Sequence, residues 1–439
     1  MLIQILQFVL GLSLLVVLHE LGHFIPAIAF KTRVEKFYLF FDPWFSLFKT
    51  KIRGTEVGIG WLPLGGYVKI SGMVDESMDN DQMSQVPKPY EFRSKPAWQR
   101  LIILLGGVTV NVITSIIIYT GMMAYYGETY VATEDLKGGI MVNELGQSFG
   151  LANGDVVMLV NGERPRRFRD IGIEILLGEG GDVVVDRSGQ LITLPITNAF
   201  IAEVLEAESP IMAPRMPYIV KGFTEVSFAD EAGLKAGDRL IALNGQSMHY
   251  VDEYFAVIPS HHGESIELTF MRGDDMLEVM VPVSDSGQIG VFREDDPKAI
   301  FPITTKTYSG MAAIGAGWNK TTSTLSSYAR QVKLMVTPET GAHKKAGGFI
   351  TILQQYPSTW DWQAFWGFTA FFSLALAFLN ILPIPALDGG HAMFVIYEMV
   401  AGKPASTKVM EGAQMIGFFI LMGLLLLVNG NDVMRLFGS

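Results

Sequence analysis

Four long stretches of this sequence carry no charged residue, and they constrain the fold more than any other feature. They cover residues 2–18, 101–126, 362–387 and 412–431. Each approaches or exceeds the roughly 20 residues that an α-helix needs to cross a bilayer. The sequence therefore predicts a multi-pass α-helical membrane protein with four transmembrane helices.

The composition agrees with a membrane protein and excludes several kinds of site. Hydrophobic residues make up 49% of the 439 residues, and the net charge is −11. Nucleic acid is not an expected partner, because no basic stripe is present to neutralise phosphates. The sequence has no cysteine. Disulfides and thiolate ligands are therefore excluded, and any zinc must be held by His, Asp or Glu.

Lysine and arginine residues set the expected orientation of the spans. Residues 31–97 hold ten of them, and Lys403 and Lys408 lie in the loop after the third span. Both segments are expected in the cytoplasm, which puts the termini and residues 127–361 outside. We expect the first span to be a retained helix rather than a cleaved signal peptide. No basic residue precedes it, and no A-x-A-like cleavage site is present.

The outer segment contains an internal repeat. SFGLANGDVVMLVNG at residues 148–162 is similar to AGLKAGDRLIALNG at residues 232–245. Both copies predict a helical turn, a Gly-Asp turn, an apolar strand and an Asn-Gly hairpin turn. This layout resembles bacterial PDZ domains in tandem, with two generic β-hairpins as the alternative.

Residues 304–336 follow the repeats and contain few acidic side chains. Their apolar residues recur at loosely helical spacing, which predicts one or two amphipathic helices against the outer membrane face. A solvated linker is the alternative for the polar middle of this segment.

The motif HELGH at residues 19–23 stands at the end of the first charge-free stretch. On a helix, His19 and His23 lie one turn apart on the same face, so both imidazoles can bind one zinc ion. Glu20 projects beside them, where it can take a proton from water at the metal. Ionisable groups within a membrane span are costly and functional by default, so this motif is the first candidate catalytic site.

A catalytic zinc usually has three protein ligands and one open position. The candidate third ligand is Asp388, in NILPIPALDGGH at residues 380–391. Pro383 and Pro385 cannot continue a regular helix, so the backbone is expected to unwind there. The two glycines after Asp388 permit close backbone approach, and His391 is not expected to be a ligand.

These two motifs together resemble the site-2 protease family of intramembrane zinc metalloproteases, and among them the members with tandem PDZ domains. The resemblance covers nearly the whole chain. It implies that His19, His23 and Asp388 bind one zinc ion (Zn2+) per chain. It also implies that Glu20 activates water and that Asn380 holds the substrate backbone near the metal.

A third segment, GWLPLGGYVK at residues 60–69, resembles the re-entrant β-hairpin of this family. Residues 57–70 alternate like a short strand pair, with Gly65 and Gly66 turning or bulging it. An exposed strand edge can hold a substrate extended, with one carbonyl presented to zinc. The resemblance therefore implies substrate binding at Gly65, Gly66 and Tyr67, and an ordinary cytoplasmic hairpin is the alternative.

Two segments depart from the family pattern. GVTVN at residues 107–111 lacks the proline of the Gly-Pro-x-x-Asn element that family members often have in the second span. AGGF at residues 346–349 stands in place of a Ser-Gly-Pro element. Neither departure touches the expected metal ligands.

We expect a multi-pass α-helical membrane protein with a cytoplasmic re-entrant β-hairpin and two inserted extracytoplasmic PDZ domains. Its expected segments are 1–30 (first span with HExxH), 31–97 (cytoplasmic region with the hairpin), 98–126 (second span), 127–212 and 213–296 (the two PDZ domains), 297–360 (extracytoplasmic amphipathic helices), 361–388 (third span with Leu-Asp-Gly), 389–411 (cytoplasmic loop) and 412–431 (fourth span).

The expected activity is zinc-dependent hydrolysis of a peptide bond inside the lipid bilayer. The resemblance implies single-pass membrane proteins already trimmed outside as substrates, such as anti-sigma factors or remnant signal peptides. It implies a bacterial inner membrane. The active site is expected toward the cytoplasm, because the motif lies near the inner end of the first span. We expect the PDZ domains to exclude bulky ectodomains, with binding of a newly made C-terminus as the alternative. Two non-enzymatic alternatives are a catalytically inactive PDZ scaffold, which would not need Glu20, and a zinc transporter or storage protein, which would need more buried ligands.

Overall fold

The computed structural model describes residues 1–63, 65–73 and 86–437. The chain divides into two compact units, which we name the helical unit and the strand-rich unit. The helical unit comprises Met1–Gly127, Thr307–Lys333 and His343–Ser439, and the strand-rich unit comprises Glu128–Lys306 and Leu334–Ala342. Residue 64, in the expected hairpin, lies outside the described residues.

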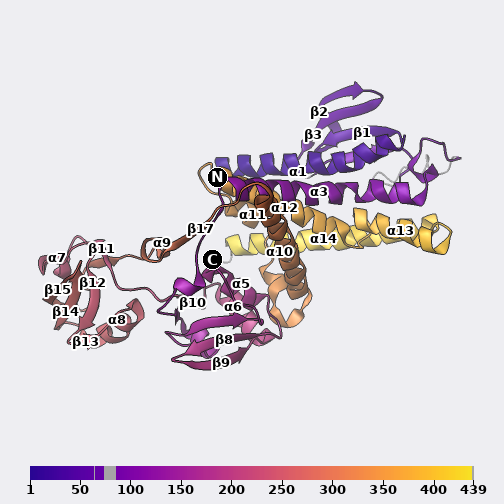
Figure 1. Cartoon of the computed structure of the whole chain (residues 1–439). Coiled ribbons are helices and arrows are strands. Elements are labelled where there is room, and N and C mark those ends of the chain that lie inside the picture. Colours follow the sequence, from indigo (N-terminus) through magenta and orange to yellow (C-terminus); the bar gives the residue numbers. More distant parts are fainter. Residues whose placement is uncertain (64, 74–85, 438–439) are drawn as a thin grey trace. The chain divides into compact units, whose positions relative to one another are not determined.

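Within the described ranges, four helices are long and apolar enough to cross a membrane, as the sequence predicts. They are α1 (Leu2–Ala29), α3 (Ala97–Tyr125), α12 (Trp362–Ile381) and α14 (Thr407–Phe437). At 1.5 Å per residue, the 28 residues of α1 span about 42 Å, more than the roughly 30 Å of a hydrocarbon core. Helices α1 and α3 lie side by side (Figure 1).

The third span ends where the sequence has its two prolines. Helix α12 stops at Ile381, and Leu382 is extended with ψ 145°. The α conformation is disfavoured for a residue that precedes a proline, here Pro383, so the helix cannot continue. Residues 382–387 therefore form an irregular connection.

A new helix, α13 (Asp388–Ala401), begins at Asp388 itself. This differs from the loop that we expected over residues 389–411. Ala392 and Val395 explain the difference, because both are buried in a core cluster that they share with residues of α1 and α3. Burial of this apolar face favours a helix where the sequence alone indicated only a short connection.

Close backbone contacts require the double glycine at the start of α13. A Cβ on Gly389 would lie 2.4 Å from the carbonyl oxygens of Ile381 and Leu382. A Cβ on Gly390 would lie 2.4 Å from the carbonyl oxygen of Ile384. Glycine at both positions lets the first turn of α13 pack directly on the end of α12.

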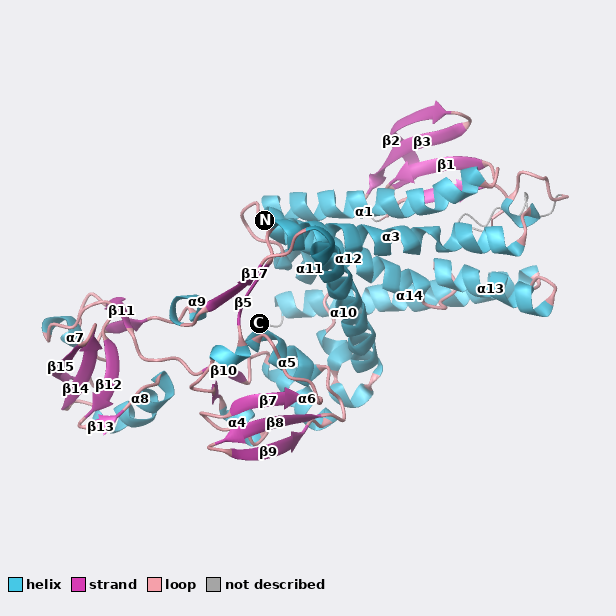
Figure 2. Ribbon diagram, viewed as in Figure 1, coloured by secondary structure: helices cyan, strands magenta, loops and turns pink. Residues whose placement is uncertain are grey.

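The segment between α1 and α3 forms a four-stranded sheet (Figure 2). Its strands are β1 (Val34–Leu39), β2 (Phe41–Ile52), β3 (Thr55–Leu62) and β4 (Tyr67–Ile70), in the order β2-β3-β1-β4. Strand β1 is parallel to β3 and antiparallel to β4. The strand pair expected over residues 57–70 is therefore wrong in its pairing, since β1 lies between its two strands.

Both edges of β3 are occupied, which explains why it does not form a hairpin with β4. On one edge β3 pairs with β2 through a two-residue turn at Arg53 and Gly54, whose φ angles of 48° and 94° suit a tight hairpin. On the other edge β3 pairs with β1. Gly58 makes room there for the buried ring of Tyr38, because a Cβ would lie 2.4 Å from that ring.

Helix α10 (Gly310–Val336) is one long helix in the segment where we expected one or two. Its Tyr328 hydroxyl donates to the Phe371 carbonyl of α12 at 2.9 Å. The next helix, α11 (Phe349–Gln355), is bound to α14 through Asp432, which accepts from the Gly348 and Ile350 amides at 3.0 and 2.9 Å. These contacts attach both helices to membrane-spanning helices of the same unit.

The strand-rich unit contains a separate apolar core for each copy of the repeat. The first copy has the sheet β7-β8-β9 and the strand pair β10-β6. Its elements are β6 (Ile140–Val142), α4 (Glu144–Ser148), β7 (Val156–Val160), α5 (Phe168–Leu176), β8 (Asp182–Arg187), β9 (Gln190–Pro195), α6 (Asn198–Ala207) and β10 (Met212–Pro214).

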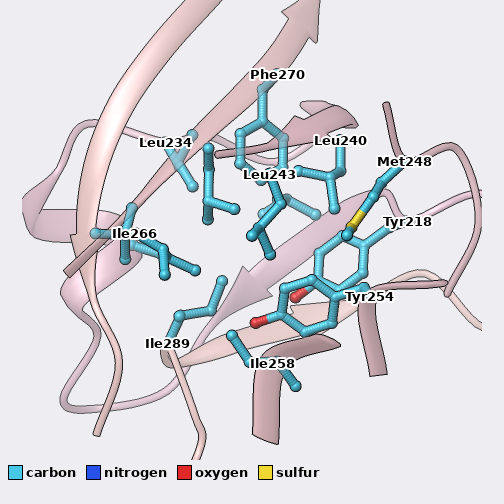
Figure 3. Packing of buried hydrophobic residues seen from close by; sticks show 14 of the residues in the cluster. Tyr218, Leu234, Leu240, Leu243, Met248, Tyr254, Ile258, Ile266, Phe270 and Ile289 are labelled. Carbon is cyan, nitrogen blue, oxygen red and sulfur yellow. The ribbon is translucent and has the colours of Figure 1, made fainter. Parts of the chain in front are cut away.

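The second copy has the sheet β13-β12-β14-β15 and the strand pair β11-β16. Leu240, Ile266 and Phe270 are fully buried at its centre (Figure 3). Its elements are β11 (Val220–Phe223), α7 (Phe228–Glu231), β12 (Arg239–Leu243), β13 (Gln246–Ser247), α8 (Val251–Val257), β14 (Ser265–Arg272), β15 (Asp275–Pro282) and β16 (Val291–Arg293).

The Gly-Asp turn of the repeat has the same ion pair in both copies. Buried Asp155 accepts from Arg187 at 2.7 and 2.8 Å, and buried Asp238 accepts from Arg272 at 2.7 Å twice. The two copies thus share a fold-defining contact, while their assignment as PDZ domains stays a prediction. The backbone partners correspond as well: the amides of Ala152 and Lys235 donate to the aspartates, and the carbonyls of Gly150 and Gly233 accept from the arginines.

Asp238→Ala is expected to destabilise the second core by about 2–4 kcal/mol, because it leaves the Arg272 guanidinium without its buried acceptor. Burial alone would raise the pKa of Asp238, but Arg272 and the Lys235 amide hold it below its usual value. The carboxylate therefore stabilises the fold fully above its unfolded pKa of about 3.9. That contribution is lost as pH falls through the lower folded pKa.

Hydrogen exchange of the β14 amides in the intact chain measures this effect. At pH 7 we expect faster exchange in Asp238→Ala than in the control Asp274→Ala, which alters an exposed turn residue. Lowering the pH below about 4 should narrow the difference between the two variants. Equal protection of both variants at pH 7 would contradict the assigned role of the ion pair.

Candidate metal centre

Three side chains from distant parts of the sequence converge in the helical unit. His19 and His23 lie one turn apart on α1, and Asp388 is the first residue of α13. The Nε2 atoms of the two histidines are 3.2 Å apart, and they lie 3.3 and 3.4 Å from Asp388 Oδ2. The structure thus brings together the three residues that the sequence singled out as metal ligands.

The three converging atoms suit a cation. Each can offer a lone pair, and Asp388 Oδ2 is buried without a hydrogen-bond partner among the described residues. Three electron-pair donors at such distances repel one another unless positive charge lies between them. Two imidazoles and one carboxylate, with a fourth position open, are the ligand set of a catalytic zinc site.

Asn380 lies at the edge of this cluster. It occupies the last turn of α12, and its Nδ2 is 3.3 Å from His19 Nε2. The side chain is therefore close enough to contact a substrate group held beside the cluster. Its expected role in binding substrate is consistent with this location.

Helix α3 contacts both histidines at the Nδ1 side of their rings. The Ile103 carbonyl lies 2.8 Å from His23 Nδ1, and Asn111 Nδ2 lies 3.1 Å from His19 Nδ1. Gly107 stands between them, one turn from each. Sequence reasoning missed these contacts, although the spacing of residues 103, 107 and 111 places all three on one face of a helix.

Small residues allow α3 to approach α1 this closely. A Cβ on Gly106 would lie 1.9 Å from the Gly22 carbonyl oxygen, and a Cβ on Gly22 would lie 2.4 Å from the Gly106 carbonyl oxygen. The two helices are therefore in backbone contact within the motif at residues 19–23. Such close crossings between apolar helices depend on glycine or similarly small residues.

Gly107→Ala is expected to weaken zinc binding by at least about tenfold. This is within the range of affinity losses caused by substitutions of residues that contact metal ligands. An added Cβ would lie 2.5 Å from His19 Cε1 and from His23 Nε2, so the rings must move. The matched control is Gly121→Ala in the same helix, where a Cβ would meet nothing within 4 Å. Competition with a chromophoric chelator measures both affinities, and equal values would contradict the steric argument.

The four-stranded sheet reaches the motif through its edge strand. A Cβ on Gly66 would lie 2.6 Å from Val16 Cγ1 and 3.5 Å from Glu20 Cγ. Strand β4 therefore begins beside Glu20, which is partly buried on α1. The Tyr67 hydroxyl donates to Asp42 at 2.8 Å, so its side chain is engaged within the sheet.

Comparison with known proteins decides the family. The model of Peptidase family M50 matches residues 7–424, nearly the whole chain. The chain belongs to peptidase family M50. This confirms the predicted membership of the site-2 protease family.

Three relatives align with this M50 peptidase over nearly its full length. A candidate zinc metalloprotease of Neisseria meningitidis is 29% identical over 458 residues, with 99% of each chain covered. The regulator of sigma-E protease RseP of Escherichia coli is 27% identical and protease RseP of Yersinia pestis 26%, each with 98% of both chains covered.

This M50 peptidase is therefore a zinc metalloprotease of the intramembrane type, with zinc as its cofactor. The four apolar helices among the described residues, together with the bacterial relatives, agree with an inner-membrane protein that acts on membrane-protein substrates. Family membership favours the enzyme over the two alternatives, a scaffold and a zinc transporter or storage protein.

Proposed function

We propose that this M50 peptidase hydrolyses a peptide bond in the membrane-spanning segment of single-pass proteins that another protease has already trimmed. The observation that carries the proposal is the convergence of His19, His23 and Asp388 at α1 and the break after α12. Anti-sigma factors and remnant signal peptides are the proposed substrates. The name of the Escherichia coli relative, a regulator of sigma-E protease, supports the first of these.

We assign zinc binding to His19 Nε2, His23 Nε2 and one Asp388 carboxylate oxygen, which are the atoms that converge. Zinc bound by these residues supplies Lewis acidity toward the scissile carbonyl and toward a water molecule. The Ile103 carbonyl oxygen accepts a hydrogen bond from Nδ1 of His23 and thereby orients the ring. The chain therefore presents the second ring nitrogen of this histidine to the metal.

We assign the role of general base to Glu20. Its carboxylate accepts a proton from the attacking water and delivers that proton to the leaving nitrogen of the substrate. Neighbouring His19 is a proposed metal ligand on the same helical turn, so Glu20 stands within one turn of the proposed reaction centre. Asn380, 3.3 Å from His19, is the proposed donor to the substrate backbone.

Strand β4 is the proposed docking edge for the substrate, at Gly65, Gly66 and Tyr67. It lies at one edge of the sheet and starts next to Glu20. An unwound substrate segment can add to such an edge through main-chain hydrogen bonds. Because the Tyr67 hydroxyl is bound to Asp42, we expect Tyr67 to act through its backbone.

The two repeat copies are proposed to be PDZ domains outside the cytoplasm that exclude proteins with bulky ectodomains. The ten Lys and Arg residues between residues 31 and 97 support a cytoplasmic location for the sheet and for the nearby metal centre. The strand-rich unit then lies on the opposite side of the membrane. Its own charges do not oppose this, because long translocated domains escape the charge rule.

One reconstitution experiment tests both the activity and the size exclusion. Wild type in lipid vesicles is given a single-pass reporter, either with a folded ectodomain or already trimmed. A second enzyme lacks residues 132–302, with Val131 joined to Ile303 through an Asn-Gly turn. Val131 and Ile303 are paired residues of the antiparallel strands β5 (Glu128–Val131) and β17 (Ile303–Lys306), so a tight turn can join them.

We expect wild type to cleave only the trimmed reporter within its span, and the excised enzyme to cleave both reporters. Peptide mass spectrometry locates the cleaved bond. Wild type that cleaves neither reporter would overturn the proposed function. An excised enzyme that cleaves the trimmed reporter but still spares the intact one would overturn size exclusion alone.

A further inference from the structure

Asn111 is a buried amide in the second span that the proposed reaction does not yet use. Its side chain is fully buried, and its Nδ2 lies 3.1 Å from His19 Nδ1. In the described part of the chain, its Oδ1 has no hydrogen-bond partner. Whichever way the amide is turned, one of its ends has no hydrogen-bond partner among the described residues, which costs about 1–3 kcal/mol inside an apolar helix bundle, so the presence of an asparagine at this location calls for a physical reason.

The geometry of His19 supplies that reason. Its Nε2 points toward the cluster, 3.3 Å from Asp388 Oδ2, and its Nδ1 points toward Asn111. A neutral imidazole that binds a metal through Nε2 carries its hydrogen on Nδ1. That hydrogen needs an acceptor, and an Asn side chain can turn its carbonyl oxygen toward it by exchanging the two ends of the amide.

His23 provides an internal comparison on the same helix pair. Its Nδ1 faces the Ile103 carbonyl oxygen at 2.8 Å, an atom that can only accept. The two histidines therefore have equivalent arrangements, with Nε2 toward the cluster and Nδ1 toward α3. Ile103 and Asn111 lie two turns apart on one face of α3, which places one polar group next to the Nδ1 atom of each ring.

The backbone around Asn111 is held in place. The Ser373 hydroxyl of α12 donates to the Asn111 carbonyl at 2.8 Å, and both residues are fully buried. One turn earlier, Gly107 is in close contact with the two imidazole rings. Helix α3 is therefore in fixed register with the metal-binding residues, as a residue that orients a ligand requires.

We propose that Asn111 is a positioning residue whose side-chain oxygen accepts the Nδ1 hydrogen of His19 and thereby directs Nε2 to zinc. This inference rests on the proposed zinc-binding role of His19. It predicts that an acceptor at position 111 matters more than the shape or polarity of the side chain. Partners of this kind typically change metal affinity by about 10- to 100-fold.

The test compares Asn111→Leu, which keeps the size but removes the acceptor, with Asn111→Asp, which keeps an acceptor. Asn111→Ala is a third variant, in case leucine prevents folding. The matched control is Ser115→Ala, one turn further along α3 and equally buried. Zinc affinity of the full-length chain in detergent is measured by chelator competition, and cobalt-substituted protein reports ligand geometry through its visible absorption.

We expect Asn111→Leu and Asn111→Ala to bind zinc about 10- to 100-fold more weakly, with an altered cobalt spectrum. Asn111→Asp should restore affinity and spectrum, and Ser115→Ala should match wild type. Wild-type affinity in Asn111→Leu, or equal loss in the Leu and Asp variants, would overturn the inference. Wild type that binds no zinc would instead overturn the proposed role of the metal centre itself.

Discussion

Glu20→Gln is expected to lower cleavage of a trimmed reporter by about 10²- to 10⁴-fold, the contribution of a positioned general base. Glutamine has nearly the same size and keeps one acceptor oxygen, but its neutral amide cannot take the proton of water. Zinc should stay bound, because the proposed ligands at His19, His23 and Asp388 are unchanged. This separation of chemistry from metal binding distinguishes a base from a ligand.

Two measurements on the same preparation decide the role of Glu20. Zinc content per chain is determined by atomic spectroscopy, and initial cleavage rates are determined with the reconstituted reporter. We expect one zinc ion per chain and almost no cleavage. Cleavage at the wild-type rate would exclude Glu20 as the base, and simultaneous loss of zinc would indicate that Glu20 contributes to metal binding instead.

Asp388→Ala is expected to weaken zinc binding by at least about 10³-fold. This loss of affinity exceeds the about 10- to 100-fold loss expected when a residue that only orients a ligand is replaced. The substitution removes the only carboxylate of the described metal cluster and leaves two imidazoles from a single helical turn. Cleavage should disappear with the metal. Two neutral ligands hold zinc poorly compared with a set of three that includes one negative charge.

His391→Ala is the control for this substitution, since it alters the same helix three residues further on. We expect it to retain zinc, because His391 is not among the converging residues. Chelator competition gives both affinities, and excess zinc added to Asp388→Ala should restore little cleavage. Tight zinc binding by Asp388→Ala would show that the carboxylate is not a ligand.

The three residues of the candidate metal centre were predictable because each of them lies within a local sequence signal. His19 and His23 need only a helix to share one face, and the charge-free stretch predicts that helix. Asp388 was accessible for a different reason: the prolines before it and the glycines after it indicate an interruption where a polar side chain can face inward. The unusual residue types at these positions carried the information.

The residues behind the cluster were not predictable in the same way. Ile103 acts through a backbone carbonyl, which any residue possesses. The roles of Gly107 and Asn111 depend on their contacts with the histidines of α1, which the sequence of α3 alone does not reveal. The sheet gives a second example, because the alternation of residues 57–70 fits several pairings, and the close fit of Gly58 against Tyr38 appears only once β1 is paired with β3.

The sequence by itself indicated the four apolar helices, the pair of repeats and the three residues of the candidate metal centre. The helices and the repeats follow from composition and periodicity, and each candidate ligand follows from the residue types within its own segment. The tertiary structure alone decided which face of α3 meets His19 and His23, where β1 enters the sheet, and that α13 starts at Asp388. The first of these features depends on the backbone contact between Gly22 and Gly106, which lie far apart in the chain, and the last depends on the packing of Gly389 on the end of α12. The energy of such a contact is a property of both partners, so neither segment alone reveals it.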